Sequence, residues 1–205
     1  RFLRIGVDGR LDRDGVELTA LDTGAVADAA ALFRENGVES VAVCLLNSFL
    51  DPVHERQAGE ALSQVFDPHN ISLSTTIAPI MGEYERGSTA VVNAYLAPRV
   101  VPYLQRLDES LRDMGLRHPM LLVQSNGGAA SVAQVAARPV NLALSGPASA
   151  VGALNLVAEQ TGHDDLISME IGGTSCDVVM MHKGDVALAD DLMIAGYHVG
   201  TPAID

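Results

Sequence analysis

The stretch Leu166–Met180, with the sequence LISMEIGGTSCDVVM, decides the fold expected for this chain. Apolar strands over residues 167–171 and 178–181 flank a turn that begins with Gly172 and Gly173. Glycines allow a backbone to approach an anion closely and expose consecutive N–H groups. The stretch therefore predicts a strand–turn–strand unit that can hold a phosphate.

Polar side chains surround this turn. The hydroxyls of Thr174 and Ser175 can add hydrogen-bond donors, and the carboxylates of Glu170 and Asp177 stand on either side. Carboxylates repel phosphate unless they hold Mg²⁺ through water, and Mg²⁺ keeps much of its hydration shell. Short glycine motifs are also frequent in plain hairpins, so an ordinary glycine turn is an equal interpretation of the spacing.

A helix rich in small residues is predicted ahead of this unit. It begins at Ser145-Gly146-Pro147 and reaches about Gln160, with Ser145 as a cap and proline in the first turn. Small side chains allow another backbone to come close, and they also suit tight packing of a helix on a sheet. The two interpretations are compatible.

The remaining chain alternates helical and strand patterns, which is typical of an α/β layer. Asp22 is expected to cap a helix over residues 26–35 that Gly37 terminates. The other expected elements are a hairpin within 1–20, strands at 38–46, 71–76 and 120–124, helices at 51–66, 83–111 and 131–137, and a strand or extended link at 140–144. Turns are expected at 125–128 and 183–185.

The composition is that of a folded protein, with 48% hydrophobic and 19% charged residues. The formal charge of −13 disfavours nucleic acid and anionic membranes as partners, since both need a cationic face. Cys44 lies in an apolar run and is expected to be buried, and two distant cysteines give no disulfide framework. These features indicate a cytoplasmic protein with no membrane-spanning segment.

Several ordered motifs resemble the hydantoinase A / 5-oxoprolinase family of the actin-like ATPase superfamily. They are Glu85-Arg86-Gly87-Ser88-Thr89, Val92-Asn93-Ala94-Tyr95-Leu96-Ala97-Pro98, Gln124-Ser125-Asn126-Gly127-Gly128, Ser145-Gly146-Pro147-Ala148 and Ile171-Gly172-Gly173-Thr174-Ser175 with Asp177-Val178. The resemblance runs from about residue 20 to residue 205. The chain departs from the family pattern at Glu170, where Asp is usual, and at Cys176, where Thr is usual.

The resemblance implies an α/β fold of mixed sheets flanked by helices, like one lobe of the actin-like, ribonuclease H-like ATPase fold. Residues 1–78 would form a subdomain of the family's N-terminal region, and residues 79–205 a segment of the ATPase lobe. It also implies an internal fragment of a longer protein, inactive alone because the opposing wall of the nucleotide cleft is elsewhere.

The activity implied is ATP-dependent opening of a cyclic amide: a hydantoin, an N-methylhydantoin or 5-oxoproline. ATP and Mg²⁺ would be used, and a second hydantoinase subunit or domain is an expected partner. The cofactor-binding residues implied are Gly172, Gly173, Thr174, Ser175, Ser145, Gly146, Asn126 and Gly127. Glu170 and Asp177 would be catalytic, and together with Asp205 would hold the metal.

Other interpretations stay open at this stage. The Asn126-Gly127 pair also fits a simple turn, and Glu83, Glu85 and Arg86 fit a helix start, where acids interact well with the helix dipole. A related branch of the family carboxylates ketones such as acetone or acetophenone with ATP. A non-catalytic nucleotide-binding or assembly module is the third possibility.

Overall fold

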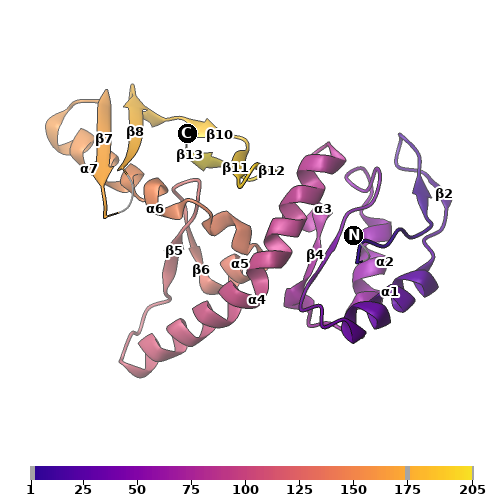
Figure 1. Ribbon diagram of the computed structural model, residues 1–205. Coiled ribbons are helices and arrows are strands. Elements are labelled where there is room, and N and C mark those ends of the chain that lie inside the picture. The colour runs from indigo at the N-terminus through magenta and orange to yellow at the C-terminus, as the bar shows by residue number, and fades with distance from the viewer. Residues whose placement is uncertain (1–2, 174–175, 205) are drawn as a thin grey trace. The chain divides into compact units, whose positions relative to one another are not determined.

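The computed structural model describes residues 3–173 and 176–204, which divide into two compact units (Figure 1). The first unit comprises residues 1–102 and 197–200, and the second comprises residues 103–196 and 201–205. The long helix α4 (Glu83–Asp113) contributes to both units. Both Pro98 and Pro102 lie inside this helix.

The first unit is built around two parallel strands joined by a helix. Its elements are β1 (Arg10–Leu11), β2 (Glu17–Thr19), α1 (Thr23–Glu35), β3 (Val41–Val43), α2 (Val53–Leu62), η1 (Pro68–Asn70), β4 (Ile71–Leu73), α3 (Ser74–Ile77), the first part of α4, and β12 (Tyr197–Val199). β3 pairs with β4 in parallel, with Val41 opposite Ile71, and β1 pairs with β2 as the expected antiparallel hairpin. The helix α1 packs against α2, and α2 lies beside β4 (Figure 1).

The helix α1 follows from its local sequence. Asp22 caps it, because the side-chain Oδ1 accepts a hydrogen bond from Ala25 N at 2.9 Å. Gly37 follows its end with a φ of +69°, a conformation that favours glycine. One face supplies Val26, Ala29, Ala30 and Phe33 to the core at helical spacing. The cap and terminator predicted from sequence are both confirmed.

The strand predicted over residues 71–76 is wrong beyond Leu73. Ser74 begins the short helix α3 instead. The reason is a tertiary contact, because Ser74 Oγ and Thr75 N both donate hydrogen bonds to the buried carboxylate of Glu55. Because both donors point towards one carboxylate, the chain leaves the strand conformation after Leu73.

The second unit consists of short antiparallel strand pairs and several short helices. Its elements are the last part of α4, β5 (Leu121–Val123), β6 (Ala129–Ser131), α5 (Val132–Ala137), η2 (Pro139–Leu142), α6 (Ser145–Ala148), α7 (Ala150–Thr161), β7 (Leu166–Ile171), β8 (Cys176–His182), β9 (Asp185–Val186), β10 (Leu188–Ala189), β11 (Leu192–Ile194) and β13 (Ala203–Ile204). β7, β8 and β9 form an antiparallel sheet. Its small core joins Ala150 and Leu154 of α7 to Val179 and Met181 of β8.

Two expectations in this unit need correction. The segment predicted as a strand or extended link at 140–144 begins as the 3₁₀ turn η2. The helix predicted from Ser145 to about Gln160 is two helices, α6 and α7, separated at Ser149. Ser145 does not cap: Leu144 precedes α6 in a left-handed conformation with a φ of +58°, and no side-chain cap bond is made there.

The sheet face of β7 and β8 that points away from α7 is apolar and exposed. Ile167 lies opposite Met180, and Met169 lies opposite Val178. These four side chains are between 52% and 71% exposed, and Ile171 is 77% exposed. The alternation that buries Val179 and Met181 therefore leaves large hydrophobic residues on the other face of the same strands.

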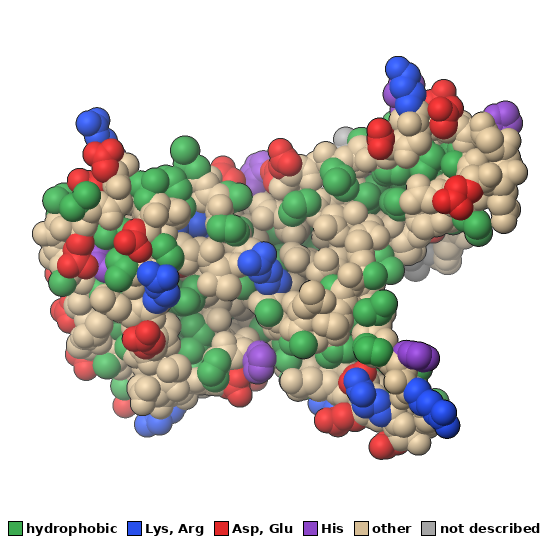
Figure 2. Space-filling view, turned by 180° about the vertical axis from the view of Figure 1, so that it is seen from behind, with side chains coloured by type: hydrophobic (Ala, Val, Ile, Leu, Met, Phe, Trp, Pro, Cys, Tyr) green, Lys and Arg blue, Asp and Glu red, His purple; other side chains and the backbone are tan. Residues whose placement is uncertain are grey.

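The elements bear out the expected α/β class with both parallel and antiparallel pairing. Basic side chains are scattered among acidic ones over the face seen in Figure 2 and form no continuous basic surface there. Among the described residues, no helix combines the length and the apolar character that crossing a bilayer requires.

Candidate functional site

The hairpin of β7 and β8 carries the two acids singled out in the sequence. Glu170 and Asp177 are direct partners in the antiparallel register, and both are half-buried. They lie on the same face of the hairpin as Val179 and Met181, since side chains alternate along a strand. The structure thus brings the two carboxyl-bearing residues together across the strands. Residues 174 and 175, expected to hold phosphate through Thr174 and Ser175, lie outside the described residues, as does Asp205.

The glycines at the turn are open to their surroundings. Gly172 and Gly173 are both exposed. A Cβ built on Gly173 meets no atom within 4 Å, and the φ of this residue lies outside the left-handed range that favours glycine. Neither packing nor backbone conformation within the described chain therefore requires glycine at position 173.

Two glycines in the segment of small residues formed by α6 and α7 are also open and are not required by local packing. A Cβ on Gly146 in α6 or on Gly152 in α7 also meets nothing within 4 Å. Both residues are exposed and neither has a positive φ. Glycine inside a helix lowers helix stability by roughly 1 kcal/mol relative to alanine. Gly152 therefore destabilises α7, and no contact among the described residues compensates for this loss.

The turn after β5 lies against the start of α7. Asn126 Oδ1 accepts a hydrogen bond from Gly128 N at 2.9 Å, and Gln124 N donates to Gly128 O at 2.8 Å. Gly127 has a φ of +78°, and a Cβ there would lie 3.4 Å from Val151 of α7. The simple Asn-Gly turn is therefore present, and the turn is also packed on the segment that contains Gly146.

A polar cluster that the sequence analysis missed ties this turn to two distant segments. Asn141 O accepts hydrogen bonds from Ser125 N at 2.7 Å and from Ser125 Oγ at 3.0 Å. Asn141 Oδ1 accepts a hydrogen bond from Thr201 Oγ1 at 2.8 Å, and Ile204 N donates to Ser125 O at 2.9 Å. No linear pattern relates Asn141 to Thr201, so no sequence signal could have found this cluster.

A small recess opens beside this cluster. Its lining residues are Gln124, Ser125, Asn126, Asn141, Thr201 and Pro202. All but proline have amide or hydroxyl side chains, and none is ionisable. The site residues of the second unit are thus a glycine turn with paired acids, an open small-residue segment, and a neutral polar recess.

The donor set fits a magnesium ion only in part. Within residues 3–173 and 176–204 no group of three or more His, Cys, Asp or Glu side chains is placed to hold a metal. Glu170 and Asp177 supply two carboxylates on facing strands. Two carboxylates suit Mg²⁺, which usually keeps several waters and takes its other ligands from substrate phosphates.

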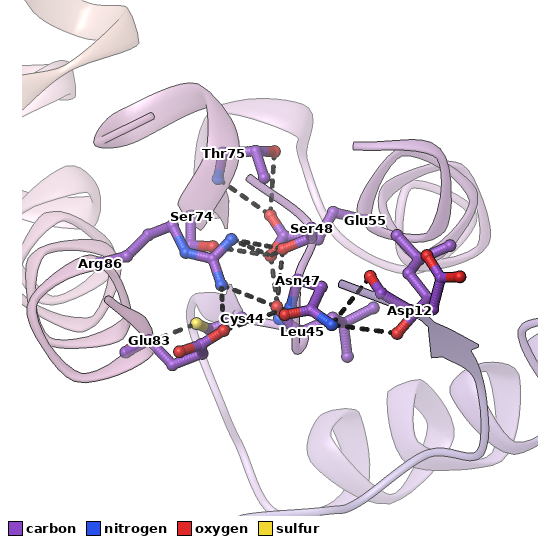
Figure 3. A network of polar contacts seen from close by, with 11 residues as sticks. Asp12, Cys44, Leu45, Asn47, Ser48, Glu55, Ser74, Thr75, Glu83 and Arg86 are labelled. Atoms are coloured by element: carbon purple, nitrogen blue, oxygen red, sulfur yellow. Dashed lines mark hydrogen bonds and ion pairs between the residues drawn. The ribbon is translucent and has the colours of Figure 1, made fainter. Parts of the chain in front are cut away.

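The first unit contains a buried ion pair that sequence analysis also missed (Figure 3). Glu55 and Arg86 are both fully buried, with 3.9 Å between Glu55 Oε1 and Arg86 Nη1. Glu55 accepts hydrogen bonds from Leu45 N, Ser48 Oγ, Ser74 Oγ, Thr75 N and Thr75 Oγ1. Arg86 donates to Ser48 Oγ and to Leu45 O.

A signal for Glu55 was available in the sequence. Glu55, Ala58 and Leu62 stand at the spacing of one helix face, and all three are buried. A carboxylate in line with a helix's apolar face indicates a buried partner. The interpretation of Arg86 as part of an ordinary helix start is incomplete, because its guanidinium is enclosed and joined to α2 and to the loop between β3 and α2.

Cys44 is not the buried core thiol that was expected, since the residue is exposed. Its Sγ nevertheless lies against α4, donating to Glu83 O at 3.6 Å and standing 3.3 Å from the position of a Cβ on Gly87. Partial burial of the Sγ atom against α4 raises the pKa of Cys44 above its ordinary value of 9.0, although the residue as a whole is exposed. A raised pKa opposes a role as a nucleophilic thiolate.

Comparison with known protein families accounts for most of the chain. Residues 86–205 match the family described as Hydantoinase/oxoprolinase, and residues 1–66 match the Hydantoinase/oxoprolinase N-terminal region. The caprolactamase subunit alpha of Pseudomonas jessenii is 36% identical over 204 residues, which is 100% of this chain and 29% of the relative. The 5-oxoprolinase of Saccharomyces cerevisiae is 28% identical over 185 residues, which is 90% of this chain and 14% of the relative.

Two solved structures are similar to the chain. The crystal structure of ATP-dependent caprolactamase from Pseudomonas jessenii superposes with a TM-score of 0.81 and 34% identity, covering 97% of this chain and 29% of that one. Nucleotide-free acetone carboxylase superposes with a TM-score of 0.84 and 22% identity, covering 98% of this chain and 28% of that one, which shows the fold alone. The chain spans less than a third of the length of each of these proteins.

Proposed function

Because the chain belongs to the hydantoinase/oxoprolinase family, we propose that the full-length protein is an ATP-dependent hydrolase that opens a cyclic amide. The observation that carries the proposal is the 36% identity to caprolactamase subunit alpha over the whole chain. The proposed substrates are five-membered ring amides such as a hydantoin, an N-methylhydantoin or 5-oxoproline.

The chemistry explains why such an enzyme needs ATP. An amide carbonyl carbon is a poor electrophile. Transfer of the γ-phosphoryl group to the carbonyl oxygen forms one P–O bond, breaks the bond to ADP and activates the carbon. Water then adds to that carbon, the ring C–N bond breaks with a proton going to nitrogen, and a second water releases phosphate from the resulting acyl phosphate. The protein's task is to position the phosphates and stabilise developing charge.

We assign the phosphate contacts to the turn at Gly172 and Gly173, continuing through Thr174 and Ser175. Open space over Gly173, with no local need for glycine, supports a group from outside the described chain at this position. Gly146 has the same property, and Ser145 precedes it. Asn126 and Gly127 belong to the turn packed beside this segment.

We assign the metal and the attacking group to the paired acids. Glu170 and Asp177 face the same side of the hairpin and would orient Mg²⁺-bound water or the water that attacks. Asp205 is the proposed third acid of the metal site. A bound Mg²⁺ would neutralise charge on the transferred phosphoryl group.

A partner subunit is part of the proposal. The relative in Pseudomonas jessenii is named as subunit alpha of a caprolactamase, so a second subunit is expected to complete the enzyme. Copurification of the full-length protein from its native host tests this directly. The ketone carboxylase branch is tested by the substrate panel below, because it consumes bicarbonate and a ketone instead of a ring amide.

The proposal is tested by ATP hydrolysis with the full-length protein and its partner. Hydantoin, N-methylhydantoin, 5-oxoproline, caprolactam, and acetone with bicarbonate form the panel. Gly173→Val is expected to lower ring-amide-dependent turnover on the order of 100-fold, because a side chain at the turn displaces the phosphate. Gly6→Val is the matched control, since Gly6 is also exposed, lacks a positive φ and has nothing within 4 Å of its Cβ position. An unchanged rate in Gly173→Val removes the phosphate assignment. Turnover with acetone and bicarbonate, but with no ring amide, transfers the protein to the carboxylase branch.

A further inference from the structure

The recess beside the Ser125–Gly128 turn is sized for a single polar group. Its volume is about 30 Å³, which is room for one or two waters or for one carbonyl or amide group of a larger molecule. Two of its walls are well buried, because Ser125 is 2% exposed and Thr201 is 4% exposed. A ligand would therefore insert an edge here and leave its bulk outside.

The recess offers hydrogen-bond donors of defined identity. Asn126 Oδ1 accepts from Gly128 N, and Asn141 Oδ1 accepts from Thr201 Oγ1. Both amide oxygens are engaged, and neither Nδ2 group donates a hydrogen bond within the described part of the chain, so the two Nδ2 groups are the donors left for a ligand. Two amide N–H donors match the two lone pairs of a carbonyl oxygen.

The recess also contains an amide that can accept. Gln124 forms part of the lining, and its side chain carries one carbonyl oxygen and one NH₂ group. A cyclic amide presents a carbonyl oxygen and, in most cases, an N–H on adjacent atoms. Side-chain amides that supply both donors and an acceptor are complementary to that edge.

The lining of this recess is uncharged. None of its six lining residues is ionisable, and the chain as a whole has a formal charge of −13. An anion placed here would meet no cationic side chain in the lining. A neutral ligand avoids this penalty, so the electrostatics favour an uncharged amide over a phosphate or a carboxylate.

The position of the recess suits a substrate. It shares Asn126 with the turn at Gly127, where a Cβ would lie 3.4 Å from Val151 at the start of α7. The short helix α6, which contains Gly146, contacts both β5 and β8. The recess and the segments assigned to phosphate therefore belong to one packed group within the second unit.

From these observations we propose that the recess is the subsite for the amide edge of the ring substrate, with Asn126 and Asn141 donating to its carbonyl oxygen. The assignment rests on the proposed function for the identity of the ligand. It names Asn141 as a specificity-determining residue that the sequence alone does not reveal.

Binding can be tested without turnover. The probe is 2-pyrrolidinone, a five-membered lactam, measured by saturation-transfer NMR with the full-length protein in the absence of ATP. Asn141→Asp keeps the oxygen that accepts from Thr201 but replaces the donor with a second oxygen, so lactam affinity is expected to fall at least about tenfold. Asn126→Asp makes the same change at the other donor and keeps the turn bond to Gly128. Asn155→Asp, at an exposed position of α7, is the matched control and is expected to leave affinity unchanged.

The outcomes distinguish this inference from the proposed function. Weakened lactam binding in both recess variants, with the control unchanged and the melting temperatures preserved, supports the subsite. Wild-type affinity in both variants overturns it, as does the absence of lactam binding in the wild type. Displacement of 2-pyrrolidinone by inorganic phosphate also overturns it, because the recess would then be an anion site. If recess variants weaken lactam binding but no ring amide stimulates ATP hydrolysis, the subsite stands and the proposed function fails.

Discussion

Glu55 and Arg86 form a fully buried ion pair, with Glu55 Oε1 3.9 Å from Arg86 Nη1 and the Ser48 hydroxyl hydrogen-bonded to both. The pair joins α2 to the N-terminal turns of α4. Its remaining hydrogen bonds go to Leu45, in the loop after β3, and to α3, so one cluster connects that loop with α2, α3 and α4.

Loss of the arginine should be strongly destabilising. Arg86→Met leaves the Glu55 carboxylate buried without its cation, which is expected to lower the free energy of unfolding by about 3–5 kcal/mol. Urea denaturation followed by circular dichroism measures the change. The double variant Glu55→Leu/Arg86→Met should lose less than the sum of the single losses, because no charge remains buried. Arg56→Met is the control: its partner Asp51 is 3.7 Å away, both side chains are largely exposed, and little change is expected.

Gly152 should be replaceable with a gain in stability. Gly152→Ala is expected to raise the free energy of unfolding by about 0.5–1 kcal/mol, because the site is helical and open. Gly37→Ala should do the reverse by about 1–2 kcal/mol, since its φ is +69°. Thermal unfolding of both variants provides the comparison. A destabilised Gly152→Ala would mean that something covers this position in the folded protein.

Cys44 should react slowly at neutral pH. Burial of its thiol raises the pKa above 9.0, so the thiolate fraction at pH 8 is smaller than that of a free cysteine. Iodoacetamide modification of a Cys176→Ser variant, followed by mass spectrometry from pH 7 to pH 10, should reach half its maximal rate above pH 9. The same sample in urea is the control and should shift back toward 9.0.

The sign of the linked effect on stability follows from this shift. The folded state holds the Cys44 proton more tightly than the unfolded state does. Its contribution to stability is therefore complete below pH 9 and is lost as the pH rises through the folded pKa. Stability that rises over this range in the Cys176→Ser variant, relative to one that also carries Cys44→Ser, would contradict the assignment.

The exposed face of β7 and β8 should make the isolated chain associate. Ile167 and Met180 lie opposite each other on this face, at 71% and 64% exposure. The double variant Ile167→Thr/Met180→Thr keeps residues that suit a strand and is expected to reduce both dye binding to exposed apolar surface and self-association in sedimentation experiments.

A matched substitution on the buried face checks the interpretation. Val179 is 3% exposed and packs against α7, so Val179→Thr should destabilise the fold without reducing association. Association that persists unchanged in the double variant would show that self-association does not use this face.

Local features of the fold could be predicted because they depend on neighbouring residues. Asp22 and Gly37 bound α1 through contacts within one helical turn, and the hairpin of β7 and β8 follows from two apolar strands around glycines. The pairing of Glu170 with Asp177 follows from that hairpin's register. The end of β4 at Leu73 could not be predicted, because the next two residues, Ser74 and Thr75, donate hydrogen bonds to the Glu55 carboxylate of α2.

The amino-acid sequence by itself determined the family, the α/β class and the glycine turn with its flanking acids, because motifs and hydrophobic periodicity act over a few residues. The tertiary structure alone decided which distant polar groups meet. It enclosed Glu55 with Arg86, and it joined Ser125, Asn141 and Thr201 beside a neutral recess. Those clusters arise because buried polar atoms must find partners wherever the folded chain brings them, and no linear spacing encodes that meeting.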